Sequence, residues 1–258
     1  MRARIIRNNS NDQIIFIISR IEDLIYNVTF DLSTGSGNII TNISIIKSEQ
    51  IDDILHIFRD VMLSGLALST FVKILSPGES VGSLTIPEGK HGIATVCSIT
   101  VDGVLLKKGI PVKPKFGGLV EIKKGMPVRF TDLIRYDSTT IDPLEILMSH
   151  SLTSVSDMLT SGSGKILVNL REITMNARNK VEEILDDMAS AGLGGILEVG
   201  ELNTDILGMT VERDHFGVAV IGGNNMMAVA QEQGFDIDTH AMSSIMNVRD
   251  MVPIDQVI

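Results

Sequence analysis

The chain has 258 residues, of which 44% are hydrophobic, and its formal net charge is −10. This composition predicts a globular protein with a substantial core, and it disfavours one that grips nucleic acid by itself, because phosphate neutralisation supplies most of that affinity. The apolar runs are too short to span a bilayer and the single cysteine, Cys97, excludes an internal disulfide, so we expect a cytoplasmic protein without membrane contact.

The first half of the chain predicts alternating strands and helices after an N-terminal strand or linker over residues 1–19. Ile14 to Ile18 is typical of a buried strand, and Ser19 with Glu22 three residues later predicts the capped start of a short helix. The elements expected next are a strand over 38–46, a helix over 48–65, strands over 70–75, 82–86 and 92–97, a helix from 98 or 100 to 108, and an extended segment over 111–122.

Residues 123–146 form a predicted connector within a basic region. Residues 107–135 hold eight lysines and arginines against two acidic residues, and 8 − 2 gives a local charge of +6. Such a region would attract a small anion more readily than a polyanion, although a solvated lysine-rich turn is the plain alternative. Residues 127–134 predict a strand, and Asp142 followed by Pro143 predicts the start of a short helix.

The second half of the chain predicts the same order of elements again. They are a strand over 165–172, a helix from 174 to 192, strands near 195–199, 207–211 and 216–221, a helix over 225–233 and a last strand within 235–247. The expected helix stops are glycines in both halves, as at Gly109 and Gly234.

An internal duplication explains this repetition. Residues 92–94 align with 217–219 at an offset of 217 − 92 = 125, and residues 34–43 align with 161–170 at 161 − 34 = 127. We therefore predict an α+β fold of two duplicated mixed α/β units, roughly β-α-β-β-α-β each and related by a pseudo-twofold axis. The units are expected over residues 20–122 and 147–258, within one domain overall.

Two turns at equivalent places in the units are candidate anion sites. Residues 97–100 and 222–225 each join a strand end to a helix start, where backbone N–H groups and the helix dipole can hold a carboxylate or phosphate. Ordinary capped helix starts are the alternative. Cys97 could act as a nucleophile only if its pKa were lowered, and a small buried cysteine is the commoner case. The five histidines have no metal-ligand spacing, so no metal is expected.

Four segments resemble the effector domain of the archaeal nitrogen-regulatory repressor NrpR family: GKHGIATVCSITVDGVLLKKGIPVKPKFGGLVEI, RFTDLIRYDSTTIDPLEIL, SGSGKILVNLREI and GGILEVGE. The resemblance extends over essentially the whole chain. It implies a non-enzymatic effector domain of a transcriptional repressor of nitrogen-assimilation genes, with 2-oxoglutarate as allosteric inducer and no cofactor. It also implies a homodimer or higher oligomer.

DNA contact in this family is implied to come from a winged-helix domain. No such domain is predicted before residue 14, so we expect DNA to be reached only through a domain absent from this chain or through another repressor subunit.

A dicarboxylate needs cationic and N–H donors at two points. As a hypothesis, the ligand role is assigned to Cys97, Ser98, Thr100, Lys115, Arg129, Tyr136, Gly222, Gly223, Asn224 and Asn225. No catalytic residue is predicted. Two other classes stay open, namely an enzyme acting on a small anionic metabolite through Cys97 or a connector carboxylate, and a purely structural oligomerisation module.

Overall fold

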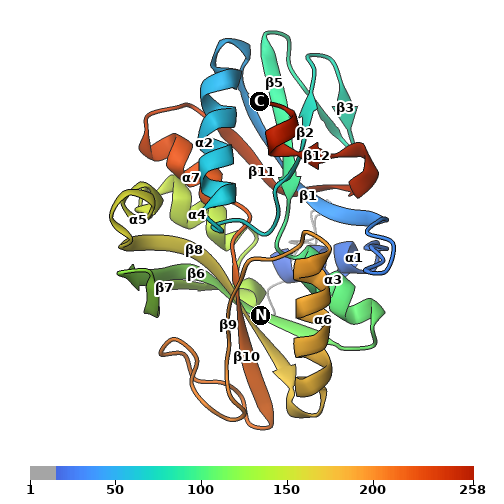
Figure 1. The fold of residues 1–258 in the computed structure, drawn as a ribbon, viewed down its shortest axis with the longest axis vertical. Coiled ribbons are helices and arrows are strands. Elements are labelled where there is room, and N and C mark those ends of the chain that lie inside the picture. The colour runs from blue at the N-terminus through green and yellow to red at the C-terminus, as the bar shows by residue number, and fades with distance from the viewer. Residues whose placement is uncertain (1–15) are drawn as a thin grey trace, which may run out of the picture.

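A computed structural model describes residues 16–258, and its elements follow the predicted order (Figure 1). The first half contains α1 (Ile17–Ile25), β1 (Asn38–Lys47), α2 (Ile51–Leu63), β2 (Phe71–Leu75), the hairpin of β3 (Ser80–Val81) and β4 (Leu84–Thr85), β5 (Lys90–Val96), α3 (Thr100–Lys107) and β6 (Val112–Lys123). The second half contains β7 (Met126–Arg135), α4 (Pro143–Ser149), α5 (Val155–Ser161), β8 (Gly164–Thr174), α6 (Arg178–Ser190), β9 (Ile196–Val199), β10 (His215–Ile221), α7 (Asn225–Glu232), β11 (Asp238–Asn247) and β12 (Val252–Pro253).

The internal duplication corresponds to two five-stranded antiparallel sheets. Their strand orders are β11-β1-β5-β2-β12 and β7-β6-β8-β10-β9. The last strand of each repeat has crossed into the other sheet, because β6 pairs with β8 and β11 pairs with β1. Both repeats therefore read β-α-β-β-α-β, which confirms the predicted α+β fold of duplicated units, with the terminal strands exchanged.

The helices are shared between the repeats in the same way. One core packs beneath α1, α3 and α6, and the other beneath α2, α4, α5 and α7. Each core thus combines helices of one repeat with the central helix of the other. Because neither repeat encloses a core by itself, the described chain is one interlocked body.

Local sequence explains where several helices begin and end. The Asp142 side chain accepts hydrogen bonds from the backbone N–H groups of Leu144, at 2.8 Å, and Glu145, at 3.2 Å, which confirms the predicted cap of α4. Beyond α3 and α7, Gly109 and Gly234 adopt φ values of +79° and +88°. These left-handed positions are the glycine stops expected from the sequence.

Two predicted strands are wrong. Ile17 and Ile18 begin α1, and Ser19 lies inside that helix instead of capping it, while residues 14 and 15 lie outside the described part. A short apolar run does not by itself distinguish a strand from a buried helix, and burial of Ile17 and Ile21 on one face favours the helix here. The strand predicted near 207–211 belongs to an irregular loop that makes only an isolated bridge between Ile206 and Met209.

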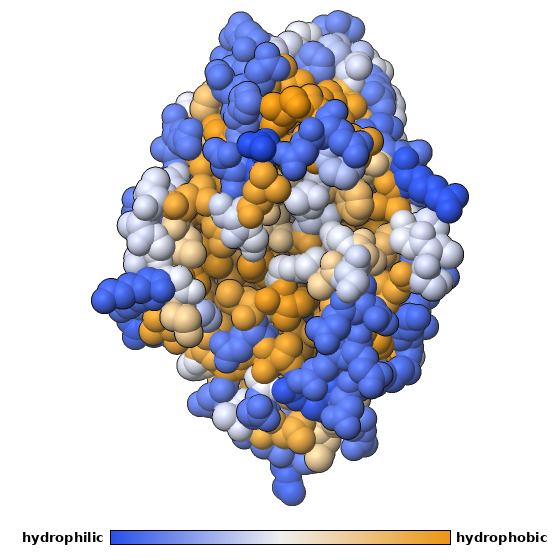
Figure 2. Space-filling view, in the orientation of Figure 1, coloured by the Kyte–Doolittle hydropathy of each residue, from blue (hydrophilic) through white to orange (hydrophobic). Residues whose placement is uncertain are grey.

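The surface shows an uneven distribution of apolar residues. Figure 2 shows many of them across the middle of the face in view and a further patch near its upper end, with hydrophilic residues around and between them. Within residues 16–258, no helix has the length and apolar character needed to cross a membrane.

Candidate functional site

The two turns predicted as anion sites lie against each other in the interior. Ser98, Thr100, Asn224 and Asn225 are all at most 2% exposed. A side chain at Gly223 would strike the carbonyl oxygen of Val96 at 2.9 Å, so the turns touch across the pseudo-twofold axis. The fold therefore brings residues 97–100 and 222–225 together.

Two asparagines at equivalent repeat positions join these turns to the opposite unit. Asn169 donates through Nδ2 to Ser98 Oγ at 2.7 Å, and Asn42 donates through Nδ2 to Asn224 Oδ1 at 2.9 Å. Their offset is 169 − 42 = 127, the value already found for the surrounding segments. This pair was not predicted from the sequence, although the repeat alignment places the two asparagines at equivalent positions.

Thr100 and Asn225 serve as another matched pair, each within its own unit. Thr100 Oγ1 accepts from the N–H of Ile40 at 3.1 Å, and Asn225 Oδ1 accepts from the N–H of Leu167 at 2.8 Å. The side chains that were candidates for ligand contact are thus engaged by the protein. Their predicted ligand role stays a prediction, and it would require this network to open.

Tyr136 and a buried ion pair extend the same network. The Tyr136 hydroxyl donates to Asn169 Oδ1, and Arg171 pairs with Asp102 while donating to the carbonyl oxygen of Ser98 at 2.9 Å. Arg171 and Asp102 are 1% exposed or less, and the sequence analysis did not single out either. Together these contacts hold the start of α3 against β8.

Cys97 lacks the environment of a reactive thiol. Burial raises the pKa of the Cys97 thiol to about 12. The thiolate is the nucleophilic form, so this thiol is a poor nucleophile at neutral pH. Residues 16–258 also contain no group of three or more His, Cys, Asp or Glu side chains arranged to hold a metal ion.

The basic region places three cations around a surface cavity of about 290 Å³ between α1 and the start of β6. Lys113 and Lys115 lie on β6, and strand pairing sets Arg135 of β7 opposite Phe116, next to Lys115. The apolar part of the wall comes from α1 through Ile18 and Ile21. This cavity can offer a small anion both charge and apolar contact.

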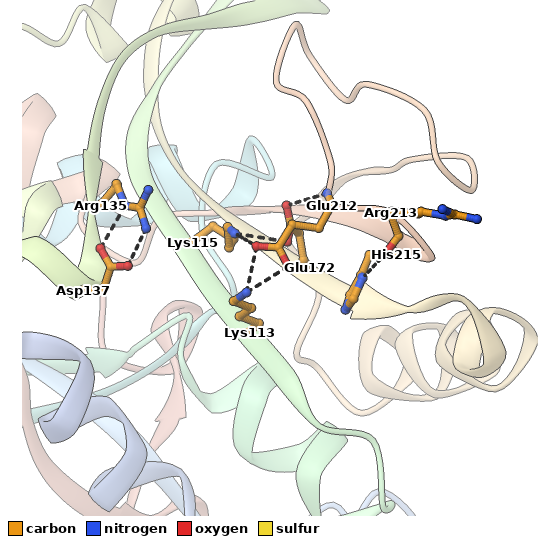
Figure 3. Close-up of polar contacts among 8 residues, drawn as sticks. All are labelled: Lys113, Lys115, Arg135, Asp137, Glu172, Glu212, Arg213 and His215. Carbon is orange, nitrogen blue, oxygen red and sulfur yellow. Dashed lines mark hydrogen bonds and ion pairs between the residues drawn. The ribbon is translucent and has the colours of Figure 1, made fainter.

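The cations of this cavity are engaged by carboxylates (Figure 3). Glu212 Oε1 lies 2.8 Å from Lys113 Nζ and 2.5 Å from Lys115 Nζ. Lys115 also pairs with the buried Glu172 at 3.2 Å. Arg135 donates to both carboxylate oxygens of Asp137, at 2.9 and 2.5 Å. The cluster of Lys113, Lys115 and Arg135 with its three carboxylates is hereafter called the cation cluster.

Ionisation in the cation cluster follows from these contacts. The lysine hydrogen bonds lower the pKa of Glu212 to about 2. Partial burial acts to lower the pKa of Lys115, but its contacts with Glu212 and Glu172 outweigh that effect and raise it. Glu212 and Lys115 are therefore charged at neutral pH, and the lysine pair is suited to hold a carboxylate.

Of the predicted ligand residues, only Lys115 lines this cavity. Arg129 lies elsewhere on β7, where its side chain is 65% exposed and pairs with Glu121 at 3.4 Å. Lys113 and Arg135 were not selected from the sequence, although both belong to the basic region. Their convergence depends on the β6–β7 and β6–β8 registers, which composition does not reveal.

A second cavity, of about 400 Å³, has the opposite chemistry. It lies at the start of β11, where Asp238 and His240 occupy the repeat positions of Lys113 and Lys115, both at an offset of 125. Asp142 and Glu145 add two more carboxyls to its wall, against one arginine, Arg20. The carboxyls of this wall outnumber its single arginine, so the cation cluster is the stronger candidate site for an anion.

The sequence matches a known family of regulatory domains. The family of NrpR regulatory domains 1 and 2 matches residues 14–253. The chain belongs to this family. The expected resemblance is thereby confirmed over nearly the whole chain.

Characterised relatives of this NrpR domain are named as regulators. It is 38% identical over 252 residues to the global nitrogen regulator NrpRI of Methanosarcina mazei, covering 96% of this chain and 77% of that protein. Over 247 residues it is 27% identical to the global nitrogen regulator NrpR of Methanocaldococcus jannaschii, covering 96% of this chain but 41% of that protein. The names place the chain among nitrogen regulators and do not name a reaction.

A solved structure shares the fold. The crystal structure of a nitrogen repressor-like protein from Methanococcus jannaschii has a TM-score of 0.81 and 27% sequence identity, covering 94% of this chain and 100% of that one. The duplicated α+β architecture is therefore a property of the NrpR regulatory domain.

Proposed function

We propose that this NrpR regulatory domain is the ligand-sensing effector domain of a repressor of nitrogen-assimilation genes, and that 2-oxoglutarate is its inducer. The observation that carries the proposal is the convergence of Lys113, Lys115 and Arg135 on one cavity. A dicarboxylate presents two anionic ends, and the lysine pair and the arginine offer two separate cationic points. The apolar wall from α1 would contact the methylene carbons between them.

The proposed regulation is a population shift. Ligand binding would favour one arrangement of the subunits by its differential affinity for the two states. We propose a homodimer or higher oligomer as the responding assembly, supported by the apolar residues exposed on one face (Figure 2). DNA contact is assigned to a winged-helix domain or a partner repressor subunit, consistent with the net charge of −10 of this chain.

Calorimetry with 2-oxoglutarate, and with glutamate and succinate as comparison ligands, tests this function. We expect selective 2-oxoglutarate binding that weakens by about tenfold or more in Lys113→Gln and in Arg135→Gln, because each loses a charge-assisted hydrogen bond. Both side chains are more than half exposed, so the variants should fold.

Arg129→Gln is the matched control, since it removes an exposed arginine from the same strand without touching the cavity. Equal loss of binding in Arg129→Gln would contradict a site at the cation cluster. A folded protein that binds none of the three ligands would favour a structural oligomerisation module. Light scattering would then show the same oligomeric state with and without ligand.

A further inference from the structure

The lysine pair of the cation cluster is already bridged by one carboxylate. Glu212 approaches Lys113 with both oxygens, at 2.8 and 2.9 Å, and its Oε1 also reaches Lys115. Figure 3 shows its side chain reaching from the loop before β10 towards the two lysines. The lysines thus form a subsite with the size and charge for a single carboxylate group.

The two glutamates that contact Lys115 are held very differently. Glu172 belongs to β8, and its side chain is 2% exposed. Glu212 belongs to the loop over residues 200–214, its side chain is 46% exposed, and its own backbone N–H donates to Glu172 Oε1 at 3.2 Å. Glu172 is therefore a fixed counter-ion of Lys115, whereas Glu212 can swing into solvent with little loss of packing.

Charge balance decides what an arriving anion must do. With Glu172 and Glu212 in place, the two lysines are fully neutralised. A further carboxylate beside Glu212 would add a like charge at short range, whereas one that replaces Glu212 would keep the cluster neutral. A ligand carboxylate at the lysine pair is therefore favoured only in exchange for Glu212.

We propose that Glu212 competes with the ligand from within the protein. Its carboxylate occupies the Lys113–Lys115 subsite until a ligand carboxylate displaces it. The proposal rests on the proposed function, since it concerns the same cavity. The released segment is short, because Val211 is buried on one side of Glu212 and β10 begins at His215 on the other. Ligand binding would thus change the conformation of residues 212–214, while the buried part of the loop keeps its position.

Replacing the competitor tests this directly by calorimetry with 2-oxoglutarate. Glu212→Gln keeps the size of the side chain and removes its charge, so we expect the affinity to rise by about tenfold, as it does when the competent state becomes fully populated. Glu22→Gln is the matched control, because Glu22 is an exposed carboxylate lining the same cavity from α1. This control removes the same charge, but within residues 16–258 the lysines form their ion pairs with Glu212 and Glu172 and not with Glu22, so the affinity should change much less.

The possible outcomes separate the two proposals. An unchanged or weaker affinity in Glu212→Gln, with clear binding by the wild type, would overturn the competitor role and leave the ligand assignment intact. Equal gains in Glu212→Gln and Glu22→Gln would also overturn it, because general electrostatics would then explain the effect. Absence of binding in the wild type and in both folded variants would overturn the competitor role together with the proposed function.

Discussion

At the scale of single residues, Asp142 combines a structural role with unusual ionisation. Its side chain caps α4, yet it is 7% exposed and lines the acidic cavity. Burial, and then the neighbouring Glu145, raise the pKa of this carboxyl from 3.8 to about 7. The folded protein therefore holds a proton that the unfolded chain has already lost between about pH 4 and pH 7, so this group lowers the stability as the pH rises through that window.

Asp142→Asn should separate the two roles. The amide oxygen can still accept the cap hydrogen bonds, while the ionisation is removed. We expect the melting temperature of the variant to exceed that of the wild type at pH 8.5, and the difference to shrink as the pH falls and to vanish below about pH 4. Asp157→Asn, an exposed carboxyl in the first turn of α5, serves as the control. A difference that does not depend on pH would show that Asp142 does not titrate in this window.

At the scale of elements, α3 depends on one glycine for its position. A Cβ built at Gly103 would fall inside contact distance of the Val28 side chain, and Val28 is itself fully buried. Glycine lets α3 approach this segment closely enough to place Ser98 and Thr100 beside the pseudo-twofold axis. The network around Asn169 therefore depends on this packing as well as on its own hydrogen bonds.

Gly103→Ala should destabilise the fold by about 1–3 kcal/mol through overpacking. Part of that loss should return in the double variant with Val28→Ala, because the smaller side chain vacates the same space. Urea unfolding measures both. Gly194→Ala is the control, since a Cβ there meets nothing within 4 Å. If Val28→Ala gave no rescue, contact with Val28 would not be the cause.

At the scale of the whole molecule, the exchanged strands β6 and β11 make the two repeats interdependent. One sheet takes β11 and β12 from the second repeat, the other takes β6 from the first repeat, and each core takes one helix from the other repeat. Such a chain should unfold in one cooperative transition despite its internal duplication. Duplication in sequence does not correspond here to two separable folding units.

Separate expression of residues 16–140 and 141–258 tests this interdependence. We expect neither half to show the dispersed NMR spectrum of a folded protein, because each would expose half of a core and an unpaired sheet edge. The intact chain should show coincident urea transitions by circular dichroism and fluorescence of its tyrosines. A well-dispersed spectrum from either half would contradict the interlocked arrangement.

Several features could be predicted because they depend on local pattern or on the repeat. The order of strands and helices, the Asp142 cap and the glycine stops were predictable, since capping and left-handed turns require particular residue types at particular places. Ile17 and Ile18 are helical where a strand is predicted, because helix and strand periodicities cannot be told apart over a few residues. The strand predicted near 207–211 is wrong for a similar reason, because a short apolar run does not by itself indicate a strand.

The amino-acid sequence by itself determined the duplication, the α+β class, the family and the basic region that contains Lys115. Only the tertiary structure decided that β6 and β11 change sheets, that the two candidate turns meet in the interior, and that Glu212 bridges Lys113 and Lys115. The physical reason is the separation in sequence over which each kind of interaction acts. Propensity, capping and internal repeats act over a few residues or repeat at a constant offset, whereas strand pairing and ion pairing join residues far apart in the chain, such as Lys113 and Glu212, which are 99 positions apart.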